Sequence, residues 1–506
     1  MPTRLLVATT AGVVTALAFE PVTWAWLMPV GLAAYFLAVR GAGTVRAAVA
    51  GAAYGLGFFG AHLWWLRTLG DSPWIALTVL QAGYLAVLGA VLARLGHRRH
   101  WPAWYAVAWL ALETVRSSFP FGGFPWGRLG LGVIDTPVAA WLPWIGVPGA
   151  TLVVVGLGAG LAWLASEGRG RGAVLVVAGA VVVLAIPAWV QPPRHETGAV
   201  TVAVVQGDVP GDGTFVAAHH YEVTRSHSDL TVQLAAEVAR GTQPEPDLVL
   251  WPENSTAVDP FLDARVHGYV IRAVDAIQRP ILFGTITEDP HDATKVLNQG
   301  IVLDPVTGVG DRYVKAHPVP FGEFVPWRGL FGTRFTEDLG LVRRNMVAGT
   351  TRTPLTIDGT RIADAICFDV AFGDTLGPQV RDGARLAVVQ TSNATFINTR
   401  QVDQQFAITR VRARELGRTI AVSSTNGRTA IIDADGRVVD TAQTRTRQVL
   451  VDRLTLYDSR PPSLWIGPVL GPVAVTSTVL GLAFSIHTYR RQRREAERRE
   501  RTEGVH

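Results

Sequence analysis

Residues 360–370, TRIADAICFDV, form an apolar run that ends in the only cysteine of this 506-residue chain. A short apolar run of this kind, preceded by Asp-Gly-Thr, is typical of a buried β-strand. If the strand continues past Cys367, then Asp369 lies on the same face, because side chains alternate along a strand. A lone cysteine in an apolar strand is most often an inert core residue. Other parts of the sequence must therefore indicate whether this thiol is reactive.

The segment from about 196 to 458 contains further runs of the same type, separated by turns and charged residues. Residues 400–416 have the pattern of an amphipathic helix. Mixed strands and helices predict a layered α/β sandwich domain. The clearest additional strands are AVTVAVVQGDVP (199–210), PDLVLWPENST (246–256), RPILFGTITED (279–289) and ARLAVVQTSNATF (384–396).

The composition of the whole chain indicates a membrane protein. The chain is 48% hydrophobic and 17% charged, whereas soluble domains carry about 25% charged residues. A single cysteine excludes an intramolecular disulfide and a cysteine-based zinc cluster. Positive charge comes almost entirely from arginine, because Lys295 and Lys315 are the only lysines. Each lysine is therefore either required by the chemistry of the protein or present through random sequence drift.

Eight apolar runs predict membrane-spanning helices, since most approach the roughly 20 residues that cross a bilayer. Arginines gather after the second, fourth, sixth and eighth runs. Because cytoplasmic loops collect Lys and Arg, both termini are expected inside and the segment between runs seven and eight outside the cytoplasm. The predicted domains are 1–192 (seven spans), 196–458 (extracytoplasmic), 464–488 (last span) and 489–506 (basic cytoplasmic tail). The runs are 5–19, 23–39, 45–66, 73–94, 102–117, 147–166, 172–190 and 465–487.

Three strand ends carry reactive groups. LWPEN supplies Glu253, RYVKAHPVPFGE supplies Lys315 and Glu323, and AICFD supplies Cys367 and Asp369. A carboxylate can take the proton of a thiol, and an ammonium favours a thiolate and stabilises an oxyanion. Taken singly, Glu253 fits an exposed loop acid. Lys315 likewise fits a solvated residue or a surface ion pair with Glu323 or a neighbouring aspartate, Asp311.

Histidines offer a rival arrangement. A Cys–His pair could use His317, His219 or His220. The adjacent pair 219–220 could also suggest a metal site, but neighbouring residues on a helix do not share a face and no third ligand has helical spacing. No metal and no cofactor are therefore expected.

Together, WPEN, YxKxHxVPFGE and ICFD resemble the carbon–nitrogen hydrolase, or nitrilase, superfamily in order and separation. Members of that superfamily use a Glu-Lys-Cys triad. The membrane part narrows the resemblance to the bacterial apolipoprotein N-acyltransferase family, through AFEPVTWAW (18–26), AHLWWLRTLG (61–70) and GGFPWGRLGLGVIDTPVAAWLPWIGVPG (122–149). The resemblance implies about eight helical spans and a nitrilase-like αββα sandwich.

By position, the resemblance makes Glu253 the general base, Lys315 the stabiliser of the oxyanion and Cys367 the nucleophile. Glu323 matches a second glutamate that supports the site. In the family, tyrosine and glutamate commonly follow the cysteine.

The sequence departs from the family at three positions. Phe368 and Asp369 stand where that tyrosine and glutamate are usual. Phe215 stands where the family has a tryptophan. The loss of the tyrosine hydroxyl at Phe368 and the shorter acid at Asp369 put those two roles in question and leave the triad in place.

The reaction implied by the resemblance transfers an acyl chain from a membrane phospholipid to a diacylated apolipoprotein through a cysteine thioester. The enzyme is expected to be a multi-pass monomer of the bacterial cytoplasmic membrane, in contact with membrane lipids and without a nucleic-acid partner. Phe124, Trp126 and Phe215 are candidates for an acyl entrance, together with Phe121. Simple interface anchoring explains Phe121, Phe124 and Trp126 equally well. Residues 324–345 are a candidate lid.

Two other classes of function stay open at this point. One is a membrane-tethered amidase or nitrilase that hydrolyses a carbon–nitrogen bond. The other is a transporter or scaffold with an inactive domain, although intramembrane ionisable residues are few. Glu113 is the main exception.

Overall fold

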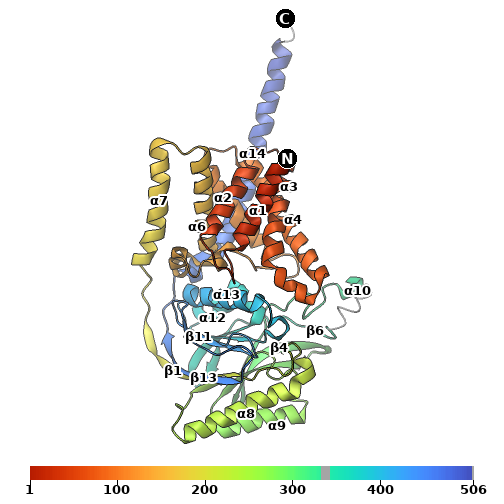
Figure 1. Cartoon of the computed structure of the whole chain (residues 1–506), viewed down its shortest axis with the longest axis vertical. Coiled ribbons are helices and arrows are strands. Elements are labelled where there is room, and N and C mark those ends of the chain that lie inside the picture. Colours follow the sequence, from red (N-terminus) through yellow and green to blue (C-terminus); the bar gives the residue numbers. More distant parts are fainter. Residues whose placement is uncertain (332–341, 504–506) are drawn as a thin grey trace. The chain divides into compact units, whose positions relative to one another are not determined.

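The computed structural model describes residues 1–331 and 342–503. The chain divides into two compact units. The helical unit comprises Met1–Gln191 and Trp465–His506, and the catalytic unit comprises Pro192–Leu464. Figure 1 shows the course of the chain through both.

All eight apolar runs of the sequence form helices. Four helices of the described residues are long and apolar enough to cross a membrane: Asp71–Leu95, Pro137–Ser166, Gly170–Trp189 and Ser463–Thr488. The prediction of eight spans is thus confirmed in part, because the other four helices are shorter or less apolar. The helices are α1 (Pro2–Ala16), α2 (Leu27–Val39), α3 (Thr44–His62), α4 (Asp71–Leu95), α5 (Trp101–Arg116), α6 (Leu142–Ser166), α7 (Gly170–Trp189) and α14 (Ser463–Glu503).

Helices α3 and α4 approach closely because glycines face backbone across their contact. A Cβ on Gly51 would lie 2.1 Å from the carbonyl oxygen of Leu85, and a Cβ on Gly89 would lie 2.1 Å from that of Ala47. Small residues of this kind let helices pack closely in lipid, where no hydrophobic effect drives helices together.

The catalytic unit contains two β-sheets packed face to face. The seven-stranded sheet has the order β13-β1-β2-β3-β4-β5, with β6 paired to β4, and the six-stranded sheet has the order β12-β11-β10-β9-β8-β7. The strands are β1 (Glu196–Gln206), β2 (Leu248–Leu250), β3 (Ile281–Asp289), β4 (Asp292–Asp304), β5 (Gly308–Val314), β6 (Asn345–Met346), β7 (Leu355–Ile357), β8 (Thr360–Ile366), β9 (Leu386–Thr391), β10 (Ile420–Ser424), β11 (Ala430–Ile432), β12 (Val438–Thr441) and β13 (Gln448–Tyr457).

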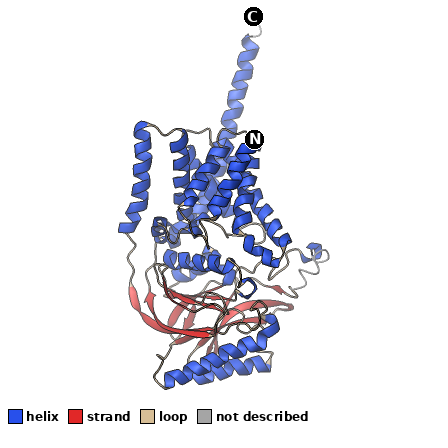
Figure 2. Ribbon diagram, viewed as in Figure 1, coloured by secondary structure: helices blue, strands red, loops and turns tan. Residues whose placement is uncertain are grey.

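Helices cover the outer face of each sheet, as the ribbon in Figure 2 shows. Helices α8 (His220–Ala239) and α9 (Ala264–Ile277) pack on the seven-stranded sheet through an apolar cluster that includes Leu234 and Val270. Helices α12 (Gly373–Arg381) and α13 (Gln401–Leu416) lie on the other side of the sandwich. A second apolar cluster, with Val204 and Val388 among its members, fills the space between the sheets. The predicted layered α/β sandwich is confirmed.

Parallel pairing directs several strand ends to one edge of the sandwich. Strands β1, β2 and β3 are mutually parallel, and so are β8, β9 and β10. The carboxyl ends of parallel strands are where open α/β sheets place their functional groups. The three reactive stretches of the sequence therefore belong at neighbouring strand ends.

The close contact between α3 and α4 generates a prediction. Gly89→Val should destabilise the helical unit by about 1–3 kcal/mol, because the added side chain must push the backbone of α3 away. The measurement is the thermal transition of the detergent-solubilised protein. Gly83→Val on the same helix is the matched control, since a Cβ on Gly83 meets nothing within 4 Å. Equal transitions for the two variants would contradict the tight contact.

Candidate active site

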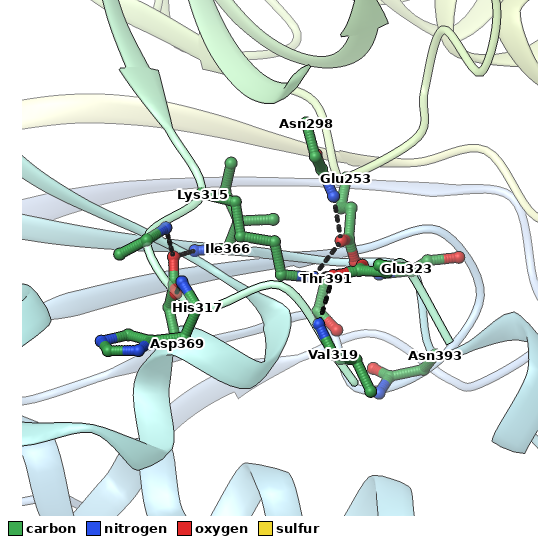
Figure 3. A network of polar contacts seen from close by, with 12 residues as sticks. Glu253, Asn298, Lys315, His317, Val319, Glu323, Ile366, Asp369, Thr391 and Asn393 are labelled. Carbon is green, nitrogen blue, oxygen red and sulfur yellow. Dashed lines mark hydrogen bonds and ion pairs between the residues drawn. The ribbon is translucent and has the colours of Figure 1, made fainter. Parts of the chain in front are cut away.

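The three predicted catalytic residues come from both sheets. Glu253 follows β2 and Lys315 follows β5 in the seven-stranded sheet, whereas Cys367 follows β8 in the six-stranded sheet. Glu253 and Lys315 are 3% and 1% exposed. Figure 3 shows the first two residues with their polar partners.

Lys315 lies between two carboxylates. Its ammonium Nζ is 3.0 Å from Glu253 Oε1 and 2.6 Å from Glu323 Oε1. Glu323 is itself fixed by the backbone amide of Val319, which donates to Oε2 over 2.8 Å. Burial by itself would lower the pKa of Lys315, but the charges of Glu253 and Glu323 outweigh it and hold that pKa well above its usual range. Lys315 is therefore an ammonium ion at any physiological pH.

The Glu253 carboxylate is held by two further donors. The side-chain amide of Asn298 donates to Oε1 over 2.8 Å, and the backbone amide of Ser392 donates to Oε2 over 2.9 Å. Sequence reasoning missed both residues. Asn298 carried little signal of its own, because β4 contains other polar residues, among them its neighbour Gln299. Ser392 acts through its backbone, which no residue type reveals.

Cys367 does not continue its strand. Strand β8 ends at Ile366, and Cys367–Ala371 form a 3₁₀ turn, η5. The expectation that a continuing strand places Asp369 beside the thiol is therefore wrong. Cys367 has φ of +53°, a left-handed conformation that costs a non-glycine residue energy and is concentrated at functional sites. The backbone reverses sharply at the cysteine.

The thiol is protonated in the resting site. Burial first, and the charges of Glu253 and Glu323 after it, raise the pKa of Cys367 to about 12, while the Lys315 ammonium opposes them. The side chain of Thr391 adds a hydrogen bond that favours the thiolate. A thiol in these surroundings would need a base to remove its proton before it could act as a nucleophile.

Asp369 ties the lysine and cysteine segments together. It is fully buried and accepts hydrogen bonds from the hydroxyl of Tyr313 (2.8 Å) and from three backbone amides. Those amides belong to Ala316 (3.2 Å), His317 (2.7 Å) and Ile366 (3.3 Å). One short carboxylate thus fixes the residues that flank both Lys315 and Cys367. Figure 3 shows two of these bonds.

The remaining candidates lie elsewhere. Phe368 is 8% exposed and packs edge-to-face on Phe372, with ring centroids 5.0 Å apart. His317 stacks on Phe372 and bonds Asp374 Oδ1 through Nε2 over 3.0 Å. His219 ends the short turn before α8, which His220 begins. Among residues 1–331 and 342–503, no group of three or more His, Cys, Asp or Glu could hold a metal ion.

The predicted entrance residues differ in exposure. Trp126 is 2% exposed and its ring lies 6.5 Å from that of Phe124, while Arg116 donates to the backbone carbonyls of both. Phe215, in contrast, is 63% exposed in the loop after β1. Their contact with acyl chains stays a prediction. Residues 332–341 of the predicted lid lie outside the described residues.

Known proteins are similar to this chain along both of its units. Residues 11–160 match the family model of the apolipoprotein N-acyltransferase N-terminal domain, and residues 201–461 match that of carbon-nitrogen hydrolase. The chain is 31% identical to the apolipoprotein N-acyltransferase of Mycolicibacterium smegmatis, over 93% of this chain and 83% of that protein. It is 32% identical to the enzyme of the same name from Ralstonia nicotianae, over 84% and 83%. For the one from Methylococcus capsulatus the identity is 29%, over 97% of each chain.

Cys367 can be followed directly, because alkylation of this chain has one thiol target. Lys315→Met should slow alkylation of Cys367 by about tenfold or more at pH 8, since losing the ammonium raises the pKa of the thiol still further. Intact-mass spectrometry over time at several pH values measures the rate. Lys295→Met is the matched control, because Lys295 is half-exposed and pairs with Asp292 over 3.0 Å. An unchanged rate in Lys315→Met would contradict the proposed electrostatics.

The hydrogen bonds of Asp369 predict that removing its carboxylate destabilises the catalytic unit. Asp369→Ala should lower the free energy of unfolding of the catalytic unit by about 2–5 kcal/mol, because it leaves buried donors unpaired at about 1–3 kcal/mol each. Thermal unfolding followed by intrinsic fluorescence measures the effect. Asp382→Ala, at an exposed position after α12, is the control and should change little. Equally small changes in both variants would show that Asp369 does not stabilise the catalytic unit in this way.

Proposed function

The chain belongs to the apolipoprotein N-acyltransferase family, and we propose that it transfers a fatty acyl chain from a membrane phospholipid to the N-terminal amine of a diacylglyceryl-cysteine lipoprotein. The observation that carries the proposal is the cluster of the buried Glu253 and Lys315 with the partly buried Cys367, in a chain whose other unit is made of apolar helices. This cluster supplies a base, a fixed positive charge and a nucleophile.

In the first half-reaction, Glu253 takes the proton of the Cys367 thiol as the sulfur attacks the ester carbonyl of the phospholipid. Lys315 stabilises the negative charge that develops on the carbonyl oxygen. The tetrahedral intermediate collapses and breaks the ester bond. Glu253 returns its proton to the departing alkoxide, which leaves as a lysophospholipid. The enzyme retains the acyl chain as a thioester.

In the second half-reaction, the neutral α-amine of the lipoprotein attacks the thioester carbonyl. Glu253 accepts a proton from the amine, and Lys315 again stabilises the oxyanion. The carbon–sulfur bond breaks, the sulfur regains a proton and the acylated lipoprotein departs. Glu323 keeps Lys315 charged and in place. Two products that leave in turn imply ping-pong kinetics.

The membrane location follows from the substrates. Removing an acyl chain from lipid costs about 0.8 kcal/mol for each CH₂ group, so a site that works at the bilayer avoids that cost. We propose that all eight apolar helices lie in the membrane, with both termini cytoplasmic and the catalytic unit on the other side. The arginine distribution supports this sidedness, and the domain limits proposed are 1–192, 196–458, 464–488 and 489–506.

The family membership favours acyl transfer over the amidase alternative. The residue that most favoured the transporter alternative, Glu113, also has a structural explanation. Glu113 accepts hydrogen bonds from the Trp109 ring (3.1 Å), the Leu129 amide (2.9 Å) and the Thr151 hydroxyl (3.0 Å), and lies 3.5 Å from Arg128. These partners make Glu113 a structural centre of the loop after α5.

A transfer assay tests the function. Purified protein in phospholipid vesicles should acylate a synthetic diacylated lipopeptide, and Cys367→Ala should reduce the rate by at least about a thousandfold, because no other residue can form the acyl-enzyme. Mass spectrometry measures product and, without acceptor, the acyl group on Cys367. Lys295→Met is the control and should retain activity. Transfer by Cys367→Ala, or acyl label on another residue, would contradict the mechanism, and release of ammonia from amides without transfer would support the amidase.

A further inference from the structure

A second carboxyl lies close to the nucleophile but has no part in the steps above. Asp364 is on β8, three residues before Cys367, and is fully buried. Its neighbours Ile362 and Ile366 on the same face belong to the apolar cluster between the two sheets. Neither carboxyl oxygen of Asp364 has a hydrogen-bond partner of normal geometry among the residues that the structure describes. A buried polar group in this state demands an explanation.

The side-chain oxygen of Gln390 points toward the space next to the Asp364 carboxyl. On the adjacent strand β9, Val388 is paired with Asp364, and Gln390 lies two residues further along the same face. A Cβ on Gly300, across the sandwich, would lie 2.5 Å from both Asp364 Oδ2 and Gln390 Oε1. Both oxygens therefore point into the same small space beside Gly300. Gln390 Oε1, too, has no partner in the described part of the chain.

The orientation of Gln390 cannot be reversed. Its Nε2 donates to the backbone carbonyl of Trp251 over 2.6 Å. A flipped amide would set Oε1 against that carbonyl, which also only accepts. Gln390 Oε1 is thus fixed on the side of Asp364. Two oxygens that only accept repel each other in a buried space, whereas a proton on Asp364 would let its carboxyl donate to Gln390 Oε1.

The charged surroundings agree with a neutral carboxyl. Burial, followed by the charge of Asp369, raises the pKa of Asp364 well above its usual range, and the amide of Ala365 offsets this only in part. Tyr313, on β5, also interacts with Asp364. Neither neighbour supplies a positive charge that could keep Asp364 ionised.

We propose that Asp364 is a neutral carboxylic acid that donates a hydrogen bond to Gln390, and that it positions the base and the nucleophile relative to each other. The chain of contacts runs from Asp364 through Gln390 to the carbonyl of Trp251, two residues before Glu253. Gln390 also lies two residues before Ser392, whose amide donates to Glu253. Asp364 therefore joins the segment of Cys367 to both segments that hold the base. It is a positioning residue, since it touches no substrate.

The first test measures protonation and needs no substrate. Above the ordinary carboxyl pKa of about 4, Asp364 ionises in the unfolded chain but not in the folded one, so this residue makes the wild type less stable as pH rises. The effect reaches about tenfold in the folding constant per pH unit, until the pH passes the folded pKa. Asp364→Asn keeps the shape and a donor but does not titrate.

The expected result is that Asp364→Asn gains thermal stability relative to wild type as pH rises from 5 to 8. Asp382→Asn, at an exposed position, is the matched control and should show a constant difference. A difference that stays flat or falls with pH for Asp364→Asn would mean an ionised or freely solvated Asp364 and would overturn the proposal.

The second test measures positioning and rests on the proposed function for its assay. Asp364→Val should lower kcat of acyl transfer by about 10–100-fold with KM within about twofold, because a misplaced base affects chemistry more than binding. Asp364→Asn should restore kcat to within about threefold of wild type. Wild-type kcat in Asp364→Val would overturn the positioning role.

Where Asp364→Val does not fold, Gln390→Leu interrupts the same chain of contacts, and normal kcat in that variant would overturn the role equally. If the wild type itself transfers no acyl chain, the proposed function fails while the stability test still decides the protonation of Asp364.

Discussion

The catalytic unit depends on one buried ammonium held between two carboxylates. An isolated charge at the depth of Lys315 would cost several kcal/mol, and Glu253 and Glu323 offset that cost only if all three groups stay in place. A thiolate on Cys367 would add negative charge beside these carboxylates, and this effect adds to burial, the larger cause, in raising the pKa of the thiol to about 12. In the proposed mechanism the thiol proton moves to Glu253, which leaves the total charge of the site unchanged.

This constraint explains why the site is built from two sheets. Glu253 and Lys315 end strands of one sheet, and Cys367 ends a strand of the other. Only rigid packing between the sheets can hold such groups at fixed distances. Asp369 makes the most direct link, because it accepts from amides on both the lysine and the cysteine segments. Both carboxylate oxygens of Asp369 are thus engaged by buried donors.

Much of the site could be predicted because its chemistry resides in residue types at strand ends. Glu253 and Cys367 follow apolar strands that run parallel to their neighbours, and the carboxyl ends of such strands are a usual place for functional groups. The turn at Cys367 could not be predicted, since a positive φ without glycine has no local signal. The role of the Ser392 amide could not be predicted either, because tertiary packing, and not residue type, determines which backbone amides donate to a site. In the helical unit, apolar composition predicted every helix. It overstated how many are long and apolar enough to span, because helices α2 and α5 have only 13 and 16 residues.

The segment around the nucleophile carries two buried aspartates with opposite environments. Asp369 meets four donors, three of them backbone amides, which suits a carboxylate. Asp364, five residues earlier, meets apolar side chains and the oxygen of Gln390, which suits a carboxylic acid. The charge of Asp369 further opposes ionisation of Asp364. The same residue type therefore serves as an acceptor after the turn and as a donor before it, because environment determines which protonation state is stable. Two ionised aspartates here would add further negative charge beside a thiol that must lose its proton to Glu253. A neutral Asp364 adds no negative charge near the thiol, and it still links the strands that carry the proposed base and nucleophile.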